Sequence, residues 1–150
     1  MTVTVTVRPV EAADHGAWAR LYAGYADFYK VVQTDAMRAT VWGWIHDPAC
    51  EVEGLVATGG AGRVIGIAHF RPYRRPLSAS VGGFLDDLFV DPDARGSGAA
   101  QALIAGVEAI GRARGWSVIR WITAADNARA RAVYDRLAVA TPWVTYDIRL

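Results

Sequence analysis

The stretch Leu88-Phe-Val-Asp-Pro-Asp-Ala-Arg-Gly-Ser-Gly-Ala-Ala100 decides the fold of this chain. An apolar, β-branched run ends at Val90, and Pro92 closes it because proline has no backbone donor for a strand partner. Apolar residues then recur at helical spacing as far as Ile110, which predicts a strand, a turn and a helix. The first N–H groups of such a helix lack partners and, with the helix dipole, attract an anion. We therefore expect a phosphate-bearing ligand at this turn.

Two common phosphate-binding motifs do not fit the turn. A P-loop needs Lys followed by Ser or Thr after its last glycine, and this chain has Ala99-Ala100 there. A dinucleotide fingerprint needs three glycines directly after the strand and an acidic residue about 20 positions later. Here the third glycine position holds Gln101, and the later segment Trp116–Trp121 contains no acid. Both motifs are therefore excluded on spacing.

A third pattern does fit. The sequence Arg95-x-x-Gly98-x-Ala100, preceded by Leu-x-Val, resembles the pyrophosphate loop of the GNAT superfamily of acyl-CoA N-acyltransferases. The segment Asn127-x-x-Ala130-x-x-x-Tyr134 resembles the second motif of that family, an Asn and a Tyr on the next helix. The resemblance covers nearly the whole chain and implies that acetyl-CoA is a co-substrate. The residues it assigns to acetyl-CoA are Leu88, Phe89, Val90, Arg95, Gly96, Ser97, Gly98, Ala99, Ala100, Asn127 and Tyr134.

Each of these motifs also has an ordinary structural interpretation. A glycine-rich turn between a strand and a helix is often only a tight turn. Tyr134 shares an apolar helix face with Val133 and Leu137, where a tyrosine commonly belongs to the core. Asn127 is a residue type that frequently begins a helix.

Composition limits the classes of protein to consider. With 150 residues and a net charge of +1, the chain is expected to form one domain, residues 1–150, that binds neither nucleic acid nor membrane. Its single cysteine, Cys50, excludes an internal disulfide and suits a reducing compartment. The three histidines lack metal-ligand spacing, and we find no signal peptide or membrane-spanning run. We expect a cytoplasmic protein without a metal.

The pattern along the chain predicts a mixed α/β fold with the order βααβββαβαβ and helices on both faces of the sheet. The resemblance adds that this sheet is mostly antiparallel. A basic, proline-containing loop is predicted over Arg71–Ser80. The predicted strands are Thr2–Arg8, Val52–Thr58, Val64–Pro72, Gly83–Val90, Trp116–Thr123 and Trp143–Leu150. The predicted helices run from Glu11 to about Tyr29, from Thr34 or Asp35 to Asp47, from about Ala100 to Gly115 and from Asp126 or Asn127 to Leu137.

The resemblance also implies catalytic roles. Tyr134 matches the general acid of the family, which protonates the leaving thiolate. The stretch Phe-Leu-Asp-Asp-Leu-Phe-Val resembles the diamine (polyamine) acetyltransferase branch, which has Leu-Glu-Asp-Phe-Phe-Val. By that match Asp86 is the base and Asp87 a substrate-binding acid. Because Asp is shorter than Glu, we expect Asp86 to act through a water molecule. The alternative is that one of the two carboxylates caps a turn or pairs with an arginine.

Two geometric expectations accompany these roles. Side chains alternate along a strand, so Asp86 and Asp87 are predicted to point to opposite faces. The oxyanion of the reaction needs a hydrogen-bond donor, and we expect a backbone N–H near Phe89 and Val90, where strands of the family carry a bulge.

The acceptor pocket is predicted from the aromatic residues of the first two helices. With Asp86 and Asp87, the candidates Asp27, Tyr29 and Trp42 would surround a small cationic amine. The segment from Ala140 to Tyr146 also resembles subgroups described as histone- or polyamine-acetyltransferase-like. Two alternatives remain open: acetylation of a protein lysine or N-terminus, and a non-catalytic acyl-CoA-binding regulatory module. The family resemblance further suggests a homodimer.

Overall fold

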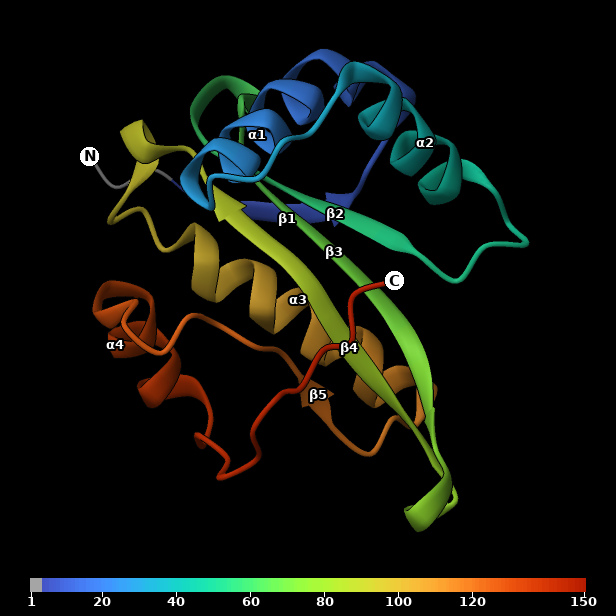
Figure 1. Ribbon diagram of the computed structural model, residues 1–150. Coiled ribbons are helices and arrows are strands. Elements are labelled where there is room, and N and C mark those ends of the chain that lie inside the picture. Colours follow the sequence, from blue (N-terminus) through green and yellow to red (C-terminus); the bar gives the residue numbers. More distant parts are fainter. Residues whose placement is uncertain (1–3) are drawn as a thin grey trace.

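The computed structural model describes residues 4–150 (Figure 1). Of the first predicted strand, residues 2 and 3 lie outside the described part. The elements, in chain order, are β1 (Thr6–Pro9), α1 (His15–Phe28), α2 (Asp35–His46), β2 (Glu53–Thr58), β3 (Val64–Arg75), β4 (Ser80–Val90), α3 (Ala99–Arg114), β5 (Ile119–Arg120) and α4 (Ala128–Leu137).

The strands form one mixed sheet in the order β1-β2-β3-β4-β5. The first three pairings are antiparallel, and β4 pairs with β5 in parallel. The expectation of a mixed, mostly antiparallel α/β fold is thus confirmed. A parallel pair needs a crossover connection, and α3 supplies it between β4 and β5.

Helices cover both faces of this sheet (Figure 1). On one face α1 and α2 pack over a core that contains Trp18, Leu21 and Ile67. On the other face α3 packs through Leu103 and Val107. The two cores share the strands β2, β3 and β4, so the middle of the sheet is buried from both sides. None of the helices in residues 4–150 combines the length and the apolar character that a bilayer crossing requires.

The hairpin of β3 and β4 is longer than predicted. The ladder continues as far as the pair Arg75–Ser80, so Arg71–Ser80 is mostly strand rather than the predicted loop. Tyr73 contacts the ring of Phe84 with centroids 5.8 Å apart, and Arg71 lies 5.0 Å from the same ring centroid. These cross-strand contacts stabilise basic and proline residues in extended structure, which their composition alone does not predict.

The second half of the sheet is shorter than predicted. The strand expected over Trp116–Thr123 is confined to Ile119–Arg120, because the chain turns away from β4 after two paired residues. The strand expected over Trp143–Leu150 does not form: this segment is irregular chain without a sheet partner among residues 4–150. The period-2 pattern of side chains is present there, but the neighbouring strand is missing.

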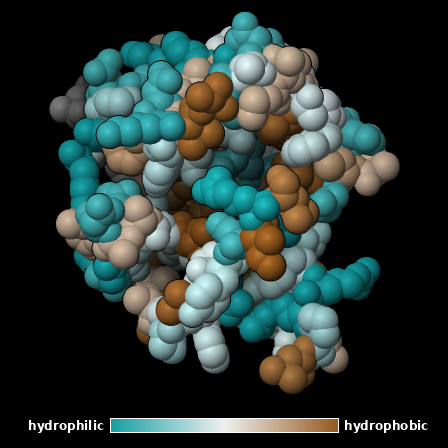
Figure 2. Space-filling model, in the orientation of Figure 1, coloured by the Kyte–Doolittle hydropathy of each residue, from teal (hydrophilic) through white to brown (hydrophobic). Residues whose placement is uncertain are grey.

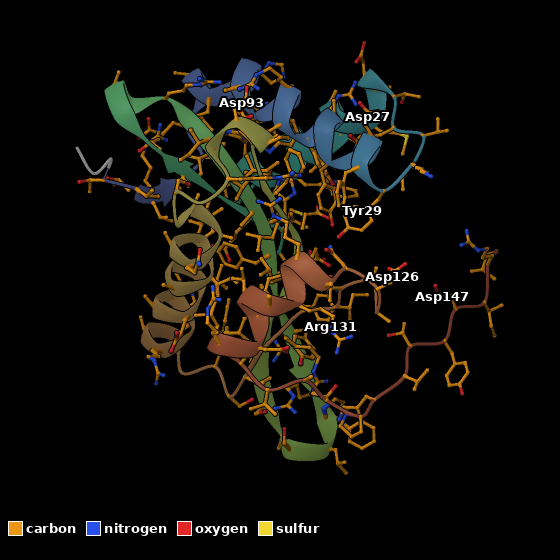
Figure 3. All side chains as sticks on the ribbon, turned by 90° about the vertical axis from the view of Figure 1, so that its left-hand side faces the viewer. Asp27, Tyr29, Asp93, Asp126, Arg131 and Asp147 are labelled. Atoms are coloured by element: carbon orange, nitrogen blue, oxygen red, sulfur yellow. The ribbon has the colours of Figure 1, made fainter. Side chains whose placement is uncertain are left out.

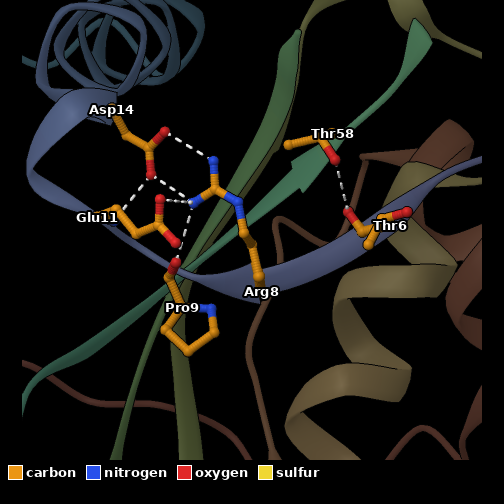
Figure 4. Close-up of polar contacts among 6 residues, drawn as sticks. All are labelled: Thr6, Arg8, Pro9, Glu11, Asp14 and Thr58. Carbon is orange, nitrogen blue, oxygen red and sulfur yellow. Dashed lines mark hydrogen bonds and ion pairs between the residues drawn. The ribbon is translucent and has the colours of Figure 1, made fainter. Parts of the chain in front are cut away.

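An ion pair fixes the first helix relative to the sheet (Figure 4). Arg8 on β1 donates from both terminal nitrogens to Asp14, at 2.7 and 2.9 Å. Asp14 is 6% exposed and also accepts the N–H of Glu11. The hydrogen bonds from Arg8 hold the pKa of this carboxyl below its usual value. Because Asp14 directly precedes α1, the pair sets where that helix starts over the sheet.

Candidate functional site

The turn after β4 has the geometry of an anion site. Gly96 and Gly98 have φ angles of 79° and 85°, in the left-handed region that favours glycine, and α3 begins at the next residue. Within residues 4–150 the structure gives no hydrogen-bond acceptor to the N–H groups of Gly96, Gly98, Ala100 and Gln101. Apart from the residues adjacent to it in sequence, no residue has an atom within 4 Å of a Cβ built on either glycine. Four free donors therefore surround open space at the positive end of a helix.

A buried carboxylate supports this turn from behind. Asp91 is 5% exposed and accepts the N–H of Asp93 at 3.0 Å. It also pairs with Arg20 of α1 and Arg63, each at 3.3 Å. The hydrogen bond from Asp93 and the two guanidinium groups hold the pKa of Asp91 below its usual value. This role of Asp91 was not predicted from the sequence, although an Asp-Pro-Asp at the end of a strand is a typical turn signal.

Beside the turn, the edge of β4 that faces β5 is open. The two strands pair only at Gly83–Ile119 and Phe84–Arg120, and further along they diverge. The N–H of Asp91 donates to Ile65 on the other side, in β3. Since N–H directions alternate along a strand, those of Leu88 and Val90 point away from β3, into the gap. An extended ligand chain can therefore pair with this edge.

A bulge in β4 brings two carboxylates together. His69 pairs with Asp87 and Phe70 pairs with Leu85, so Asp86 has no cross-strand partner. The extra residue changes the alternation, and the prediction that Asp86 and Asp87 point to opposite faces is wrong. Both line one hollow of about 260 Å³. This bulge lies at Asp86, three residues before Phe89. The family resemblance placed a bulge near Phe89 and Val90. The other residues lining this acidic hollow are Tyr22, Val41, Trp44, Glu51, Val52, His69 and Arg71.

A buried hydrogen-bond network holds Asp87 in place. The indole N–H of Trp18 donates to Nε2 of His69 at 2.8 Å, and Nδ1 of His69 lies 2.8 Å from a carboxylate oxygen of Asp87. The hydroxyl of Tyr22 donates to the same oxygen at 2.9 Å. Because an indole can only donate, Nε2 must accept, and the ring hydrogen is at Nδ1 facing Asp87. His69 was not predicted as a site residue, because its only signal in the sequence is its position in an otherwise apolar strand.

The two carboxylates have opposite pKa shifts. Burial would raise the pKa of Asp87, but the hydrogen bonds from His69 and Tyr22 bring it below the usual value. For Asp86, burial raises the pKa, and the hydrogen bond from Nε of Arg71, at 3.0 Å, only partly offsets that effect. The neighbouring charge of Asp87 raises the pKa of Asp86 further. Asp87 therefore holds a negative charge firmly, whereas Asp86 takes up a proton more readily.

Tyr134 lies on the other side of β4 from this network. Its ring packs edge-on against Trp121 with centroids 5.5 Å apart, on the core beneath α3. Burial raises its pKa, and Tyr29 adds to the shift. Tyr29 is 39% exposed and points from the end of α1 toward α4 (Figure 3). Asn127 accepts the N–H of Ala130 at 3.3 Å and so begins α4, as one of the two interpretations of this residue expects.

The predicted acceptor residues are only partly brought together. Tyr29 lies near Tyr134, and its ring contacts Tyr25 with centroids 5.0 Å apart. Asp27 is exposed, farther from α4 than Tyr29 (Figure 3). Trp42 packs between the helices against Trp18, at 4.9 Å between ring centroids, and does not line the acidic hollow. The tryptophan that does line it is Trp44 of the same helix.

Comparisons with known proteins identify the family and the fold. The acetyltransferase (GNAT) family model matches residues 18–138. The D-amino-acid N-acetyltransferase HPA3 of Saccharomyces cerevisiae is 28% identical over 143 residues, which is 95% of this chain and 89% of that protein. A crystal structure of a ribosomal-protein-alanine N-acetyltransferase from Brucella melitensis biovar Abortus 2308 has a TM-score of 0.80 and 25% identity, covering 98% of this chain and 99% of the other. An aminoglycoside N-acetyltransferase AAC(6')-Iy in complex with CoA has a similar fold, with a TM-score of 0.82, 21% identity and 99% and 97% coverage.

The opposite pKa shifts in the acidic hollow make a testable prediction about stability. At a pH above the pKa that Asp87 has in the unfolded chain, its carboxylate stabilises the fold. This contribution is lost as the pH falls through the lower pKa that Asp87 has in the folded chain. Asp86 has a raised folded pKa, so its contribution increases as the pH falls. The free energy of unfolding of wild type minus that of Asp87→Asn should therefore shrink from pH 6 to pH 3. The same difference for Asp86→Asn should grow.

Urea unfolding of the wild type and both variants at several pH values measures these differences. Each variant is the control for the other, because they remove neighbouring charges of the same sign. Parallel pH profiles for the two variants would contradict the assignment of the network to Asp87.

Proposed function

The chain belongs to the acetyltransferase (GNAT) family of N-acetyltransferases, and we propose that it transfers the acetyl group of acetyl-CoA to the primary amine of a small cationic acceptor. The observation that carries this proposal is the group of free N–H donors from Gly96 to Gln101 beside the open edge of β4. The donors suit a diphosphate, and the strand edge suits the amide-bearing chain that links it to the thioester. A ligand held at both places would have its thioester beside β4.

The backbone of β4 supplies the electrophilic help that the reaction needs. When the amine attacks the thioester carbon, the carbonyl oxygen becomes an oxyanion. The N–H groups of Leu88 and Val90 point into the gap and are fixed by the strand. A donor that is already oriented stabilises the oxyanion without reorganising. Such a donor lowers the activation free energy by a few kcal/mol and so raises the rate about 10²–10³-fold. The tetrahedral adduct then collapses with cleavage of the carbon–sulfur bond.

Tyr134 is the proposed general acid. The departing CoA thiolate needs a proton, since a free thiol has a pKa near about 8.5. Burial raises the pKa of Tyr134, so its hydroxyl keeps its proton through the neutral range and can donate it to the sulfur. The position of Tyr134 on α4, packed on Trp121, holds the hydroxyl on the side of β4 opposite the acidic hollow.

Asp86 is the proposed base. The attacking amine must lose a proton, and of the two carboxylates in the acidic hollow Asp86 binds a proton more readily because its pKa is raised. Its side chain is 31% exposed, so water can reach it and relay the proton. Asp87 is a poor candidate for this step since His69 and Tyr22 already occupy one of its oxygens. We assign Asp87 to binding the positive charge of the acceptor.

The composition of the acidic hollow supports a cationic acceptor. It contains three carboxylates, those of Glu51, Asp86 and Asp87, and aromatic rings from Tyr22 and Trp44. Carboxylates and aromatic faces both attract ammonium groups. A volume of about 260 Å³ suits a small molecule better than a peptide. These features favour a small amine over a protein lysine.

A second class of acceptor, an amino acid, is favoured by Arg71. It is the one arginine or lysine among the described residues that line the acidic hollow, and its guanidinium already contacts the carboxylate of Asp86 through two nitrogens. A guanidinium can also donate hydrogen bonds from its remaining N–H groups to a second carboxylate. An α-amino acid offers an ammonium group for Asp87 and a carboxylate for Arg71. The relative HPA3, by its name, acetylates D-amino acids.

The cradle at α3 is tested by Gly98→Ala. The added methyl would occupy the open space in which the phosphates are proposed to lie. We expect the affinity for acetyl-CoA to fall about tenfold or more, the equivalent of one lost charge-assisted hydrogen bond. Calorimetry measures the dissociation constant. Gly62→Ala is the matched control: it has the same left-handed backbone, with φ of 71°, and equally open space, but lies in the turn before β3. Equal binding by both variants would contradict the cradle.

Tyr134→Phe should lower kcat about 10²-fold, the typical worth of a general acid, and leave the affinity for acetyl-CoA within twofold, or ~0.4 kcal/mol. Steady-state rates of thiol release and calorimetry separate these two effects. Tyr73→Phe is the control. It also removes one tyrosine hydroxyl, which is buried in the distal hairpin and has no hydrogen-bond partner among the described residues. An unchanged kcat for Tyr134→Phe would exclude Tyr134 as the general acid.

A panel of amines with acetyl-CoA, read by thiol release, identifies the acceptor class. We expect turnover with small diamines or amino acids and little with neutral or anionic amines. For amino acids, Arg71→Gln should lower kcat/KM about tenfold or more while diamine turnover is retained. Arg74→Gln, on the same strand but outside the acidic hollow, is the control. Stoichiometric acetyl-CoA binding without thiol release from any amine would instead support a non-catalytic binding module.

A further inference from the structure

His69 is enclosed between α1 and the sheet. Its side chain is buried, and Trp18, whose indole it contacts, is buried completely. Helix α1 lies over the sheet (Figure 1), and the surface over α1 and α2 mixes hydrophilic and hydrophobic side chains (Figure 2). Opposite His69 in β2 is Gly54, which has no side chain. Because water does not solvate the imidazole, its charge depends on the groups that touch it.

Carboxylates are the charged groups nearest to His69. From β4, Asp87 contacts Nδ1 at 2.8 Å. From α1 comes the phenol of Tyr22, edge-on to the imidazole with ring centroids 4.6 Å apart, and burial together with the charge of Asp87 raises its pKa so that it stays neutral. The residues of α2 that line the acidic hollow are uncharged. A neighbouring carboxylate normally favours a charged imidazole. The other charged groups that line the hollow are Glu51, Arg71 and Asp86.

The indole of Trp18 opposes a second proton on His69. The hydrogen of the neutral imidazole is at Nδ1, so a further proton would have to bind Nε2. The indole N–H already donates to Nε2 at 2.8 Å, and an indole has no acceptor to offer in return. Protonation would bring two N–H groups together and leave a buried donor without an acceptor, which is unfavourable. This hydrogen bond therefore selects both the tautomer and the neutral state of His69.

A neutral His69 leaves the charge of Asp87 uncompensated. His69 and Tyr22 both donate to the same carboxylate oxygen, Oδ2, and neither of them brings a positive charge. Among the described residues that line the acidic hollow, three carboxylates then face a single guanidinium. A protonated His69 would instead form an ion pair with Asp87 and weaken the attraction of the hollow for an ammonium group.

We propose that Trp18 is a positioning residue for acceptor binding: its indole N–H keeps His69 uncharged, so that Asp87 presents a full negative charge to the ammonium group of the acceptor. The inference rests on the proposed function, in which a cationic amine enters the acidic hollow. It adds that binding of the amine persists in mild acid. There Asp87 stays ionised because its pKa is lowered, and His69 stays neutral because Trp18 occupies Nε2.

Nitrogen NMR of the imidazoles reads the charge of His69 directly. In the wild type, His69 should keep the chemical shifts of the neutral Nδ1–H tautomer from pH 8 to pH 5. In Trp18→Phe, which keeps an aromatic ring but removes the donor, the same nitrogens should move to the shifts of the charged ring over this range. His69→Gln assigns the signals. His46, which is exposed, is the internal control and should titrate alike in both proteins.

Calorimetry with putrescine, a diamine that is doubly charged throughout this range, connects the charge of His69 to binding. From pH 7.5 to pH 5.5 the dissociation constant should increase about tenfold more for Trp18→Phe than for the wild type. Comparison at equal pH removes the contribution of Asp86, which titrates in both proteins. The double variant Trp18→Phe with His69→Gln should lose the extra pH dependence, because an amide takes up no proton. Trp116→Phe removes an indole from the core on the other face of the sheet and is the matched control.

A charged His69 in the wild type at pH 7 would overturn the proposal, and this measurement needs no variant to fold. A His69 that stays neutral in Trp18→Phe would overturn it as well. So would equal pH dependence of putrescine binding in the wild type and Trp18→Phe, or no binding of putrescine to the wild type. The proposed acetyl transfer fails separately: the absence of thiol release from every amine would refute that reaction, while a neutral His69 and tight putrescine binding would still support the role of Trp18.

Discussion

One extra residue in β4 is the constraint on which the candidate site depends. Asp86 has no partner in β3, and from that point the strand alternates with the opposite parity. Before the bulge, N–H groups such as that of Gly83 point toward β5, and after it the N–H of Asp91 points toward β3. The bulge thus frees the amides of Leu88 and Val90 in the gap. In the same place it sets two adjacent carboxylates in one hollow, which a regular strand would separate.

The two carboxylates illustrate how surroundings divide roles between identical side chains. Asp87 is fixed by a chain of donors that starts at the indole of the fully buried Trp18 and passes through His69. Asp86 has only Arg71 and partial access to water. Opposite pKa shifts in adjacent groups are typical of sites in which one group moves a proton and the other holds a charge. The proposed reaction uses them in this way.

Local signals predicted the part of the site that is local in sequence. The strand, the glycine turn and the helix from Leu88 to Ile110 follow from periodicity and turn chemistry, and the structure confirms these elements. The position of Tyr134 on a helix also followed from its motif. The position of the bulge at Asp86 could not be derived from the residues, because it is a property of the register between β3 and β4 rather than of either sequence; the family resemblance placed a bulge near Phe89 and Val90. His69 was missed for the same reason: its partners, Trp18 and Asp87, are 51 and 18 residues away.

The strand at Trp143–Leu150 was predicted from a pattern that is present, but strand formation needs a neighbour that residues 4–150 of one chain do not place beside it.

The separation of the acidic hollow from the cradle at the start of α3 has a consequence for kinetics. The acidic hollow is built from α1, α2, β3 and β4 and opens on one face of the sheet, whereas the phosphate cradle is at the start of α3 on the other. In the proposed reaction the acceptor and the thioester would enter by separate routes and meet only across β4. Neither would need to pass the binding place of the other, so the fold allows either substrate to arrive first, and the product amide and free CoA can leave independently.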